Sequence, residues 1–255
     1  MFTPQERASL RDRLIECAAS DSRISGVAIT GSAALNREDE WSDIDLAFGV
    51  HDRTQLPGLL REWTGRLYEQ GAVHHVDFFR ASWIYRTFLL RNSLQVDLAF
   101  VAAEEFRATA PTFKLICGHA NEPRHVGPST DELVGLGLLY ALHARSCIGR
   151  RHWWQAEYMI SAVRDHALAL ACLRLKLPTR DGRGMDQLPQ EVTDPYRESL
   201  VQRLDPQELA RTFQVAMQGL REEIRRSDGE LAHRLDSMLE SFPPTTRPYA
   251  DDSSV

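Results

Sequence analysis

Two aspartates separated by one apolar residue are the side chains of this sequence best suited to chemistry. The segment Asp43-Ile44-Asp45-Leu46 alternates acidic and apolar residues, as a half-buried strand does. Side chains at i and i+2 of a strand project to the same face, so Asp43 and Asp45 are expected to present two carboxylates side by side. Ionised carboxylates repel each other, and a cation relieves that repulsion. The pair therefore predicts a site for Mg²⁺ or Mn²⁺, which prefer oxygen ligands.

A Gly-Ser pair precedes these acids. Gly31 and Ser32 follow a predicted strand over 24–30, and ten residues separate Ser32 from Asp43. Glycine has no β-carbon, so the backbone at Gly31 can approach a phosphate closely. A helix beginning after Ser32 would add backbone N–H groups that favour an anion. Together these features predict a site for a metal-bound triphosphate.

A third carboxylate would complete a site for two cations, and Asp97 is the best candidate. It lies in the apolar segment LQVDLAF, which we predict to be a central strand. A buried acid is costly unless it is paired or bound to a metal. Asp77, in the segment VHHVDFF, is a weaker alternative for which we favour a structural role.

A β-sheet would bring these side chains together, and the first part of the chain carries the pattern for one. Short apolar runs bounded by Gly, Asn or Ser predict strands, and apolar residues at helical spacing predict helices. The polar link 91–93 suits a hairpin. We predict helices over 4–20 and 56–68, and strands over 24–30, 43–50, 73–79, 84–90 and 94–101.

The rest of the chain has helical spacing almost throughout. Ser129 and Glu132 have the spacing of a capping box, which favours the start of a helix. We predict helices over 129–147, 153–175, from 206 onward and over 231–242. The predicted fold class is α+β, in four parts: an N-terminal α/β domain with a small mixed sheet over 1–105, an irregular connection over 106–128, a helical bundle over 129–242 and a flexible tail over 243–255.

The predicted helix over 153–175 carries a polar stripe that includes Glu157, Ser161 and Asp165. A solvated helix face is one interpretation. The other places Glu157 in an active site between the two domains, where it binds the acceptor or acts as its base. Trp153 and Trp154 are expected to pack inside the bundle rather than to bind a substrate.

Composition limits the partners. The net charge of −6 argues against broad binding of nucleic acid, and no apolar run approaches the roughly 20 residues of a membrane helix. The N-terminus lacks the apolar core of a signal peptide, and the four cysteines form no CxxC pair. We therefore predict a cytoplasmic protein with reduced thiols, a monomer or homodimer, whose partners are small molecules rather than nucleic acid or membrane.

The arrangement Gly31-Ser32, then Asp43-Ile44-Asp45-Leu46, then Asp97 on a later strand resembles the nucleotidyltransferase superfamily related to DNA polymerase β. The helical remainder resembles the C-terminal bundle of bacterial nucleotidyltransferases that inactivate aminoglycosides or lincosamides. The resemblance implies transfer of a nucleoside monophosphate from an NTP, ATP foremost, to a hydroxyl of a small acceptor, with pyrophosphate leaving. An antibiotic-like compound is a candidate acceptor, which would make antibiotic resistance a candidate role of the protein.

The resemblance also implies a role for each site residue. Asp43 and Asp45 would hold two Mg²⁺ ions, and Asp97 would support one ion or take the proton of the hydroxyl group. Gly31 and Ser32 would grip the terminal phosphates. A glutamate of the helical domain acts on the acceptor in some antibiotic nucleotidyltransferases, which makes Glu157 a second candidate base.

Two alternative functions remain. One is transfer of AMP to a protein, as in nucleotidyltransferases paired with toxins. The other is a catalytically silent nucleotide-binding module, which the presence of all three acids disfavours.

Overall fold

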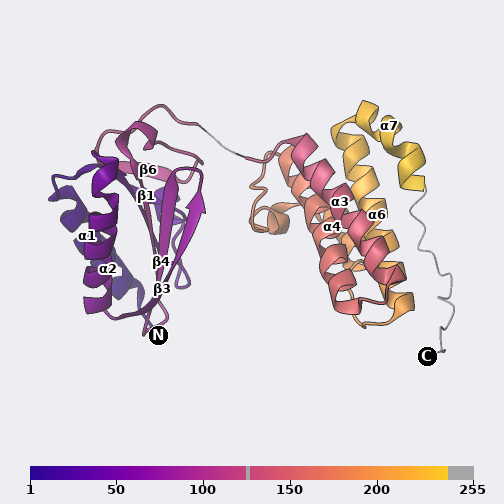
Figure 1. Ribbon diagram of the computed structural model, residues 1–255, viewed down its shortest axis with the longest axis horizontal. Helices are drawn as coiled ribbons and strands as arrows, with labels where there is room; N and C mark the ends of the chain where they lie inside the picture. The colour runs from indigo at the N-terminus through magenta and orange to yellow at the C-terminus, as the bar shows by residue number, and fades with distance from the viewer. Residues whose placement is uncertain (125–126, 241–255) are drawn as a thin grey trace. The chain divides into compact units, whose positions relative to one another are not determined.

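The computed structural model describes residues 1–124 and 127–240, and the chain divides into two compact units at residues 126 and 127 (Figure 1). The first unit combines helices with a six-stranded sheet, and the second is helical. The predicted α+β fold class is therefore confirmed.

The sheet of the first unit has the strand order β3-β4-β5-β2-β1-β6. Strands β2 and β5 are parallel, and every other neighbouring pair is antiparallel. The first five strands begin and end within one residue of their predicted bounds. The strands are β1 (Ile24–Thr30), β2 (Ile44–Val50), β3 (Ala72–Arg80), β4 (Trp83–Leu90), β5 (Gln95–Ala102) and β6 (Phe113–Gly118).

Strand β6 lies within the stretch 106–128, which we expected to be irregular, and that expectation was wrong. The strand pairs with β1 through Ile29 opposite Lys114 and Ala28 opposite Leu115. It is an edge strand without a buried face, so it lacks the apolar alternation that reveals a half-buried strand.

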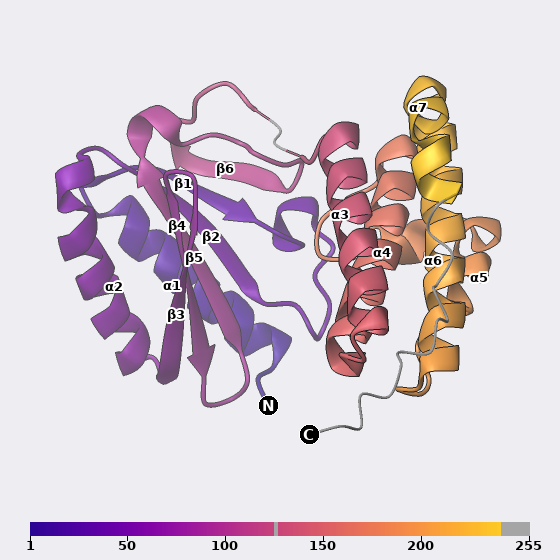
Figure 2. The same cartoon turned by 45° about the vertical axis from the view of Figure 1, so that its right-hand side comes forward.

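Helices α1 (Pro4–Ala19) and α2 (Leu56–Glu69) cover one face of this sheet (Figure 2). Both carry apolar residues at helical spacing, and these pack on the large side chains of the central strands. The ring of Trp63 on α2 lies 4.9 Å from that of Phe48 on β2, measured between centroids. Phe48 thus faces the helices, as do most of the other even-numbered residues of β2 and β5. The odd-numbered residues of these strands, Asp45 and Asp97 among them, point to the opposite face.

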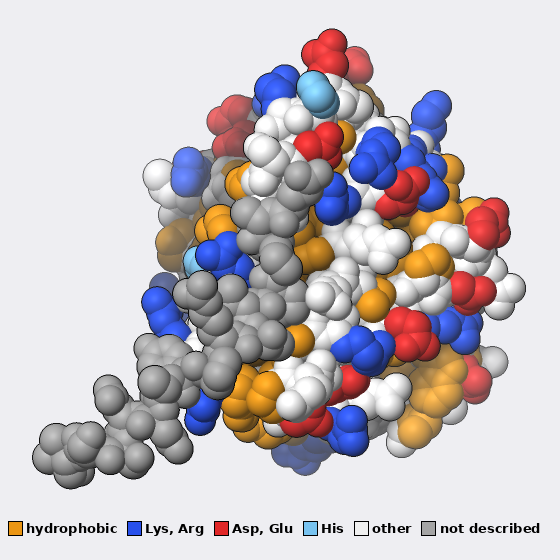
Figure 3. Space-filling view, turned by 90° about the vertical axis from the view of Figure 1, so that its right-hand side faces the viewer, with side chains coloured by type: hydrophobic (Ala, Val, Ile, Leu, Met, Phe, Trp, Pro, Cys, Tyr) orange, Lys and Arg blue, Asp and Glu red, His pale blue; other side chains and the backbone are white. Residues whose placement is uncertain are grey.

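The second unit is built on the packing of α3, α4 and α6 around one apolar core. Ser129 caps α3 by accepting a hydrogen bond from the Glu132 backbone N–H (3.1 Å), as its spacing predicts. Basic and acidic side chains intermingle on the face drawn in Figure 3. The helices are α3 (Thr130–Gly149), α4 (Trp153–Arg174), α5 (Gln190–Arg197), α6 (Pro206–Ser227) and α7 (Gly229–Glu240).

One expectation for this unit was wrong, and one helix was missed. Trp154 does not pack in the bundle, because its side chain is 78% exposed, whereas Trp153 packs against the core. Helix α5 was not predicted, since it is short and contains Pro195. The end of the predicted helix over 231–242 and the predicted tail over 243–255 lie outside the described residues. Within the described chain, no helix has the length and apolar character to cross a membrane.

Candidate metal and nucleotide site

Strand pairing places two of the predicted site residues side by side. Asp45 of β2 is the direct partner of Asp97 of β5 in the parallel register, which continues to Val50 opposite Ala102. Partners on adjacent strands share a face of the sheet, so both carboxylates lie on the face away from α1 and α2. The sheet thus holds these two acids together from distant parts of the chain.

Asp43 joins them from the residue just before β2, which begins at Ile44. One carboxylate oxygen from each of Asp43, Asp45 and Asp97 lies within 4.8 Å of the other two. All three side chains are partly buried. Among the described residues this is the one group of three or more His, Cys, Asp or Glu with such spacing. We call these residues the acidic triad.

Gln95 orients one member of the acidic triad. It lies two residues before Asp97 and on the same face of β5, and its Nε2 donates a hydrogen bond to Asp97 Oδ2 (2.9 Å). This hydrogen bond from the side-chain amide restrains the orientation of the Asp97 carboxylate.

Gly31 lies directly against the acidic triad. Its φ of +65° is in the left-handed region, and a β-carbon built on it would lie 2.7 Å from Cγ of Asp45 and overlap Oδ2. Only glycine satisfies both the conformation and the space. The sequence predicted that the backbone at Gly31 allows a phosphate to approach closely, and this stays a prediction. The structure shows that the Asp45 carboxylate lies against Gly31.

The helix considered after Ser32 is not formed. A single 3-10 turn, Ala33–Leu35, follows instead and ends at Asn36 in the left-handed region (φ 54°). The next residues, NREDEWS, carry no apolar periodicity that could bury a helix face. A turn this short provides no helix N-terminus for an anion.

Helix α1 holds the loop that follows this turn. The guanidinium of Arg7 donates to the backbone carbonyls of Asp39 (2.5 Å) and Ser42 (3.0 Å), and Arg11 pairs with Glu38 (2.7 Å). Sequence reasoning missed both arginines. The available signal is that Arg7 lies on the apolar stripe of α1, where a cation needs a partner.

Ser42 has a structural role in the turn before β2. Its hydroxyl donates to Asp39 Oδ1 (2.9 Å) and accepts from the Asp39 backbone N–H (2.9 Å). Two hydrogen bonds lower the pKa of Asp39: the bond from the Ser42 hydroxyl has the larger effect, and the bond from the Trp41 backbone N–H has the smaller one.

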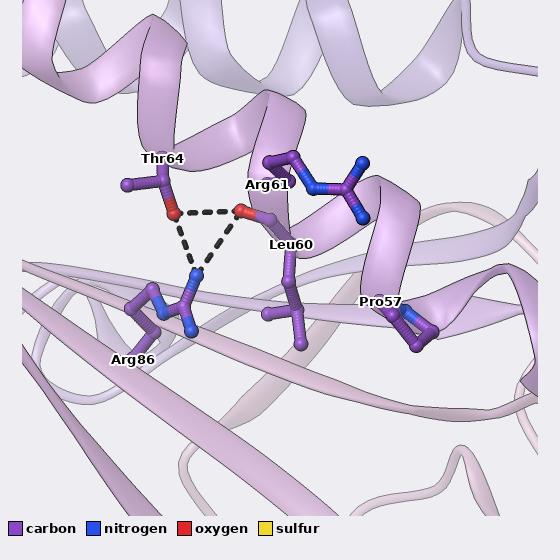
Figure 4. Close-up of a pocket in the computed structure, with 5 residues that line it drawn as sticks. All are labelled: Pro57, Leu60, Arg61, Thr64 and Arg86. Carbon is purple, nitrogen blue, oxygen red and sulfur yellow. Dashed lines mark hydrogen bonds between the residues drawn. The ribbon is translucent and has the colours of Figure 1, made fainter.

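Asp77 is not part of the acidic triad. It lies on the helix-facing side of β3, where Arg86 donates to both of its oxygens (2.6 and 2.7 Å) and lowers its pKa. Arg86 also donates to Thr64 Oγ1 (2.6 Å) and the Leu60 carbonyl (3.1 Å), as Figure 4 shows at a shallow pocket beside α2. With its donors committed to α2 and β3, this arginine ties the helix to the sheet.

Glu157 lies on α4 of the second unit, where it is partly buried and accepts a hydrogen bond from Ser161 Oγ (2.8 Å). Arg164 pairs with Asp165 (3.1 Å) on the same helix. These contacts suit a solvated helix face, and the part of Glu157 in acceptor binding stays a prediction.

The acidic triad fits a divalent cation by its chemistry. Its donors are hard carboxylate oxygens, the ligands that Mg²⁺ and Mn²⁺ prefer over nitrogen or sulfur. Three carboxylates this close repel one another when ionised, and cations between them would relieve the repulsion.

The solved structures to which the chain is similar include two bacterial proteins. One is an aminoglycoside 6-adenyltransferase from Bacillus subtilis, with 12% identity, a TM-score of 0.41, and coverage of 95% of this chain and 99% of that one. The other is a nucleotidyltransferase-like protein from Exiguobacterium sibiricum, with 13% identity, a TM-score of 0.38, and coverage of 91% and 80%.

No family model and no curated protein sequence matches the chain. At identities this low a likeness concerns the fold alone. The function must therefore be inferred from the side chains of the site.

Proposed function

We propose that this protein is a metal-dependent nucleotidyltransferase. It transfers a nucleoside monophosphate from an NTP, ATP foremost, to a hydroxyl of a small acceptor and releases pyrophosphate. The observation that carries the proposal is the convergence of Asp43, Asp45 and Asp97, whose carboxylate oxygens lie within 4.8 Å of one another.

Asp43, Asp45 and Asp97 would hold two Mg²⁺ ions, with Asp43 and Asp45 contributing to both. A pair of such ions supplies charge neutralisation for the attacking and leaving oxygens of phosphoryl transfer. The carboxylates themselves supply fixed positions, since Asp45 and Asp97 are held by strand pairing. Positioning of this kind is a main source of catalysis in phosphoryl transfer.

Gly31 and Ser32 would bind the terminal phosphates. The left-handed Gly31 has no side chain toward Asp45, so the backbone and the carboxylate can lie side by side. The Ser32 side chain makes no capping hydrogen bond to the 3-10 turn that follows it. Its hydroxyl would donate to a phosphate oxygen.

In the reaction, the acceptor oxygen forms a bond to the α-phosphorus while the bond from that phosphorus to the oxygen bridging to the β-phosphate breaks. Pyrophosphate leaves with the electron pair of that bond. The proton of the acceptor hydroxyl passes to a carboxylate, for which we propose Asp97, oriented by Gln95. Glu157 is the second candidate for this proton.

The acceptor would be a small hydroxylated molecule. A net charge of −6 and an acidic site favour a cationic one, such as an aminoglycoside, over an anionic one. Lincosamide-like compounds are the other class to test.

The test is incubation with Mg²⁺ and ATP labelled at the α-phosphate, against a panel of aminoglycosides, lincosamides and other hydroxylated compounds. We expect label on one small acceptor and an equal amount of pyrophosphate. Asp45→Asn should lower the rate by at least about 100-fold, because a lost metal ligand removes several kcal/mol of charge stabilisation. Asp52→Asn is the matched control, since Asp52 is exposed and caps a turn in the same unit.

Other outcomes separate the alternatives. Label on a protein, with none on small molecules, would indicate AMP transfer to a protein. Absence of transfer, together with Mg²⁺-dependent ATP binding that survives Asp43→Asn in calorimetry, would indicate a silent binding module and contradict the proposal.

A further inference from the structure

The members of the acidic triad are held in place by different means. Asp45 and Asp97 lie within paired strands, whose ladder fixes their backbones. Asp43 precedes the first residue of β2 and has no strand partner in the register of the sheet. Something other than the sheet must fix the backbone that carries the Asp43 carboxylate.

Arg7 of α1 binds this backbone. Its Nη1 donates to the carbonyl oxygen of Ser42 (3.0 Å), and that carbonyl belongs to the peptide group whose N–H is that of Asp43. The same Nη1 donates to the carbonyl of Asp39 (2.5 Å), at the other end of the turn closed by the Asp39 and Ser42 side chains. One guanidinium therefore ties both ends of the turn to α1.

Arg7 is buried, so these hydrogen bonds belong to the packed interior and are not incidental contacts at the surface. The residue is 4% exposed, and its Nε lies 3.2 Å from Glu38 Oε1. Arg11, one turn further along α1, donates to the same Glu38 oxygen (2.7 Å). A buried cation is retained only where it is paired and hydrogen-bonded, and here the partners all belong to the loop that leads to Asp43.

We propose that Arg7 is a positioning residue for the metal site. By holding the peptide group before Asp43, it keeps the Asp43 carboxylate within ligand distance of Asp45 and Asp97. This inference rests on the proposed function, because it assumes that the acidic triad binds divalent cations. It adds a residue of α1 to a site that the sequence motif places wholly on strands and their loops.

The test measures Mn²⁺ binding to the full chain, without nucleotide, from the electron paramagnetic resonance signal of free Mn²⁺. Arg7→Met should weaken binding by roughly 10- to 100-fold, as the loss of outer partners does at other metal sites. Arg7→Lys keeps the charge but lacks the forked guanidinium, so a smaller loss is expected. Arg13→Met is the matched control, since Arg13 is exposed on the same helix and donates a hydrogen bond to Gln70 Oε1 (3.2 Å).

A merely structural role for Arg7 predicts a different pattern. It would lower the midpoint of urea unfolding, measured in EDTA, and leave the Mn²⁺ affinity of the folded protein unchanged. A positioning role predicts that Arg7→Met adds nothing to the loss already caused by Asp43→Asn, because both changes remove the same ligand.

Each result decides. Mn²⁺ binding as tight in Arg7→Met as in the wild type overturns the inference and leaves the proposed function standing. If Arg7→Met does not fold, Arg7→Lys decides on the same criterion. Wild-type Mn²⁺ binding that is absent, or unaffected by Asp43→Asn, overturns both the inference and the proposed function.

Discussion

Gly31 and Asp45 face each other so closely that a β-carbon at residue 31 would overlap a carboxylate oxygen of residue 45. Gly31 follows β1, and Asp45 is the second residue of β2. The backbone at Gly31 is in the left-handed region, with φ +65°, which favours glycine. Gly31 and Asp45, which belong to separate parts of the sequence motif, thus pack directly against each other in the folded protein.

Gly31→Ala should therefore disable the site more than it destabilises the fold. The new methyl group must displace the Asp45 carboxylate, and we expect nucleotidyl transfer to fall by about 100-fold or more. A non-glycine residue in the left-handed region should cost about 1–2 kcal/mol of unfolding free energy. Gly58→Ala in α2 is the control, because a β-carbon there meets nothing within 4 Å. Full activity of Gly31→Ala would contradict this relationship.

The pair formed by Asp77 and Arg86 should make stability depend on pH. The hydrogen bonds from Arg86 hold the pKa of folded Asp77 below its ordinary value of 3.8. Such a carboxyl contributes stability above its unfolded pKa and loses that contribution as the pH falls through the folded pKa.

We therefore expect Asp77→Asn to be less stable than the wild type by roughly 1–2 kcal/mol at pH 7, with the gap closing below about pH 4. Urea unfolding at several pH values measures this gap. A gap that stays constant from neutral to acidic pH would show that the ion pair is not its cause.

Glu223 should be the most important charged residue in the core of the second unit. Its side chain is 2% exposed and pairs with Arg174 of α4 (3.0 Å) and with Arg226 (3.1 Å). Glu223→Ala leaves Arg174 without this partner and should lower the unfolding free energy by about 3 kcal/mol. The neighbouring Glu222→Ala, which breaks only exposed ion pairs, should lower it by less than about 1 kcal/mol. Equal effects in urea unfolding would refute this difference.

The strands of the first unit could be predicted because their signal is local. The alternation in Asp43-Ile44-Asp45-Leu46 and the apolar run around Asp97 each identify a strand and one of its faces. The parallel pairing of Asp45 with Asp97 could not be read in the same way, since a register between distant strands depends on the whole topology of the sheet.

The parts that were missed have signals that are weak or distant. Arg7 contacts residues 32 and 35 positions away, which no local pattern reveals. Strand β6 is an exposed edge strand, and the helix considered after Ser32 gives way to a turn because the following residues are polar. Trp154 follows Trp153, which lies on the apolar stripe of α4. Successive residues of a helix point in different directions, so Trp154 lies outside the stripe and is exposed.

The most direct test of the central claim is a crystal structure of the protein with Mn²⁺ and a non-hydrolysable ATP analogue, using the anomalous scattering of manganese. We predict anomalous peaks bound by Asp43, Asp45 and Asp97, with the terminal phosphates at Gly31 and Ser32. Manganese bound elsewhere with the acidic triad empty, or a triphosphate far from Gly31, would contradict the account.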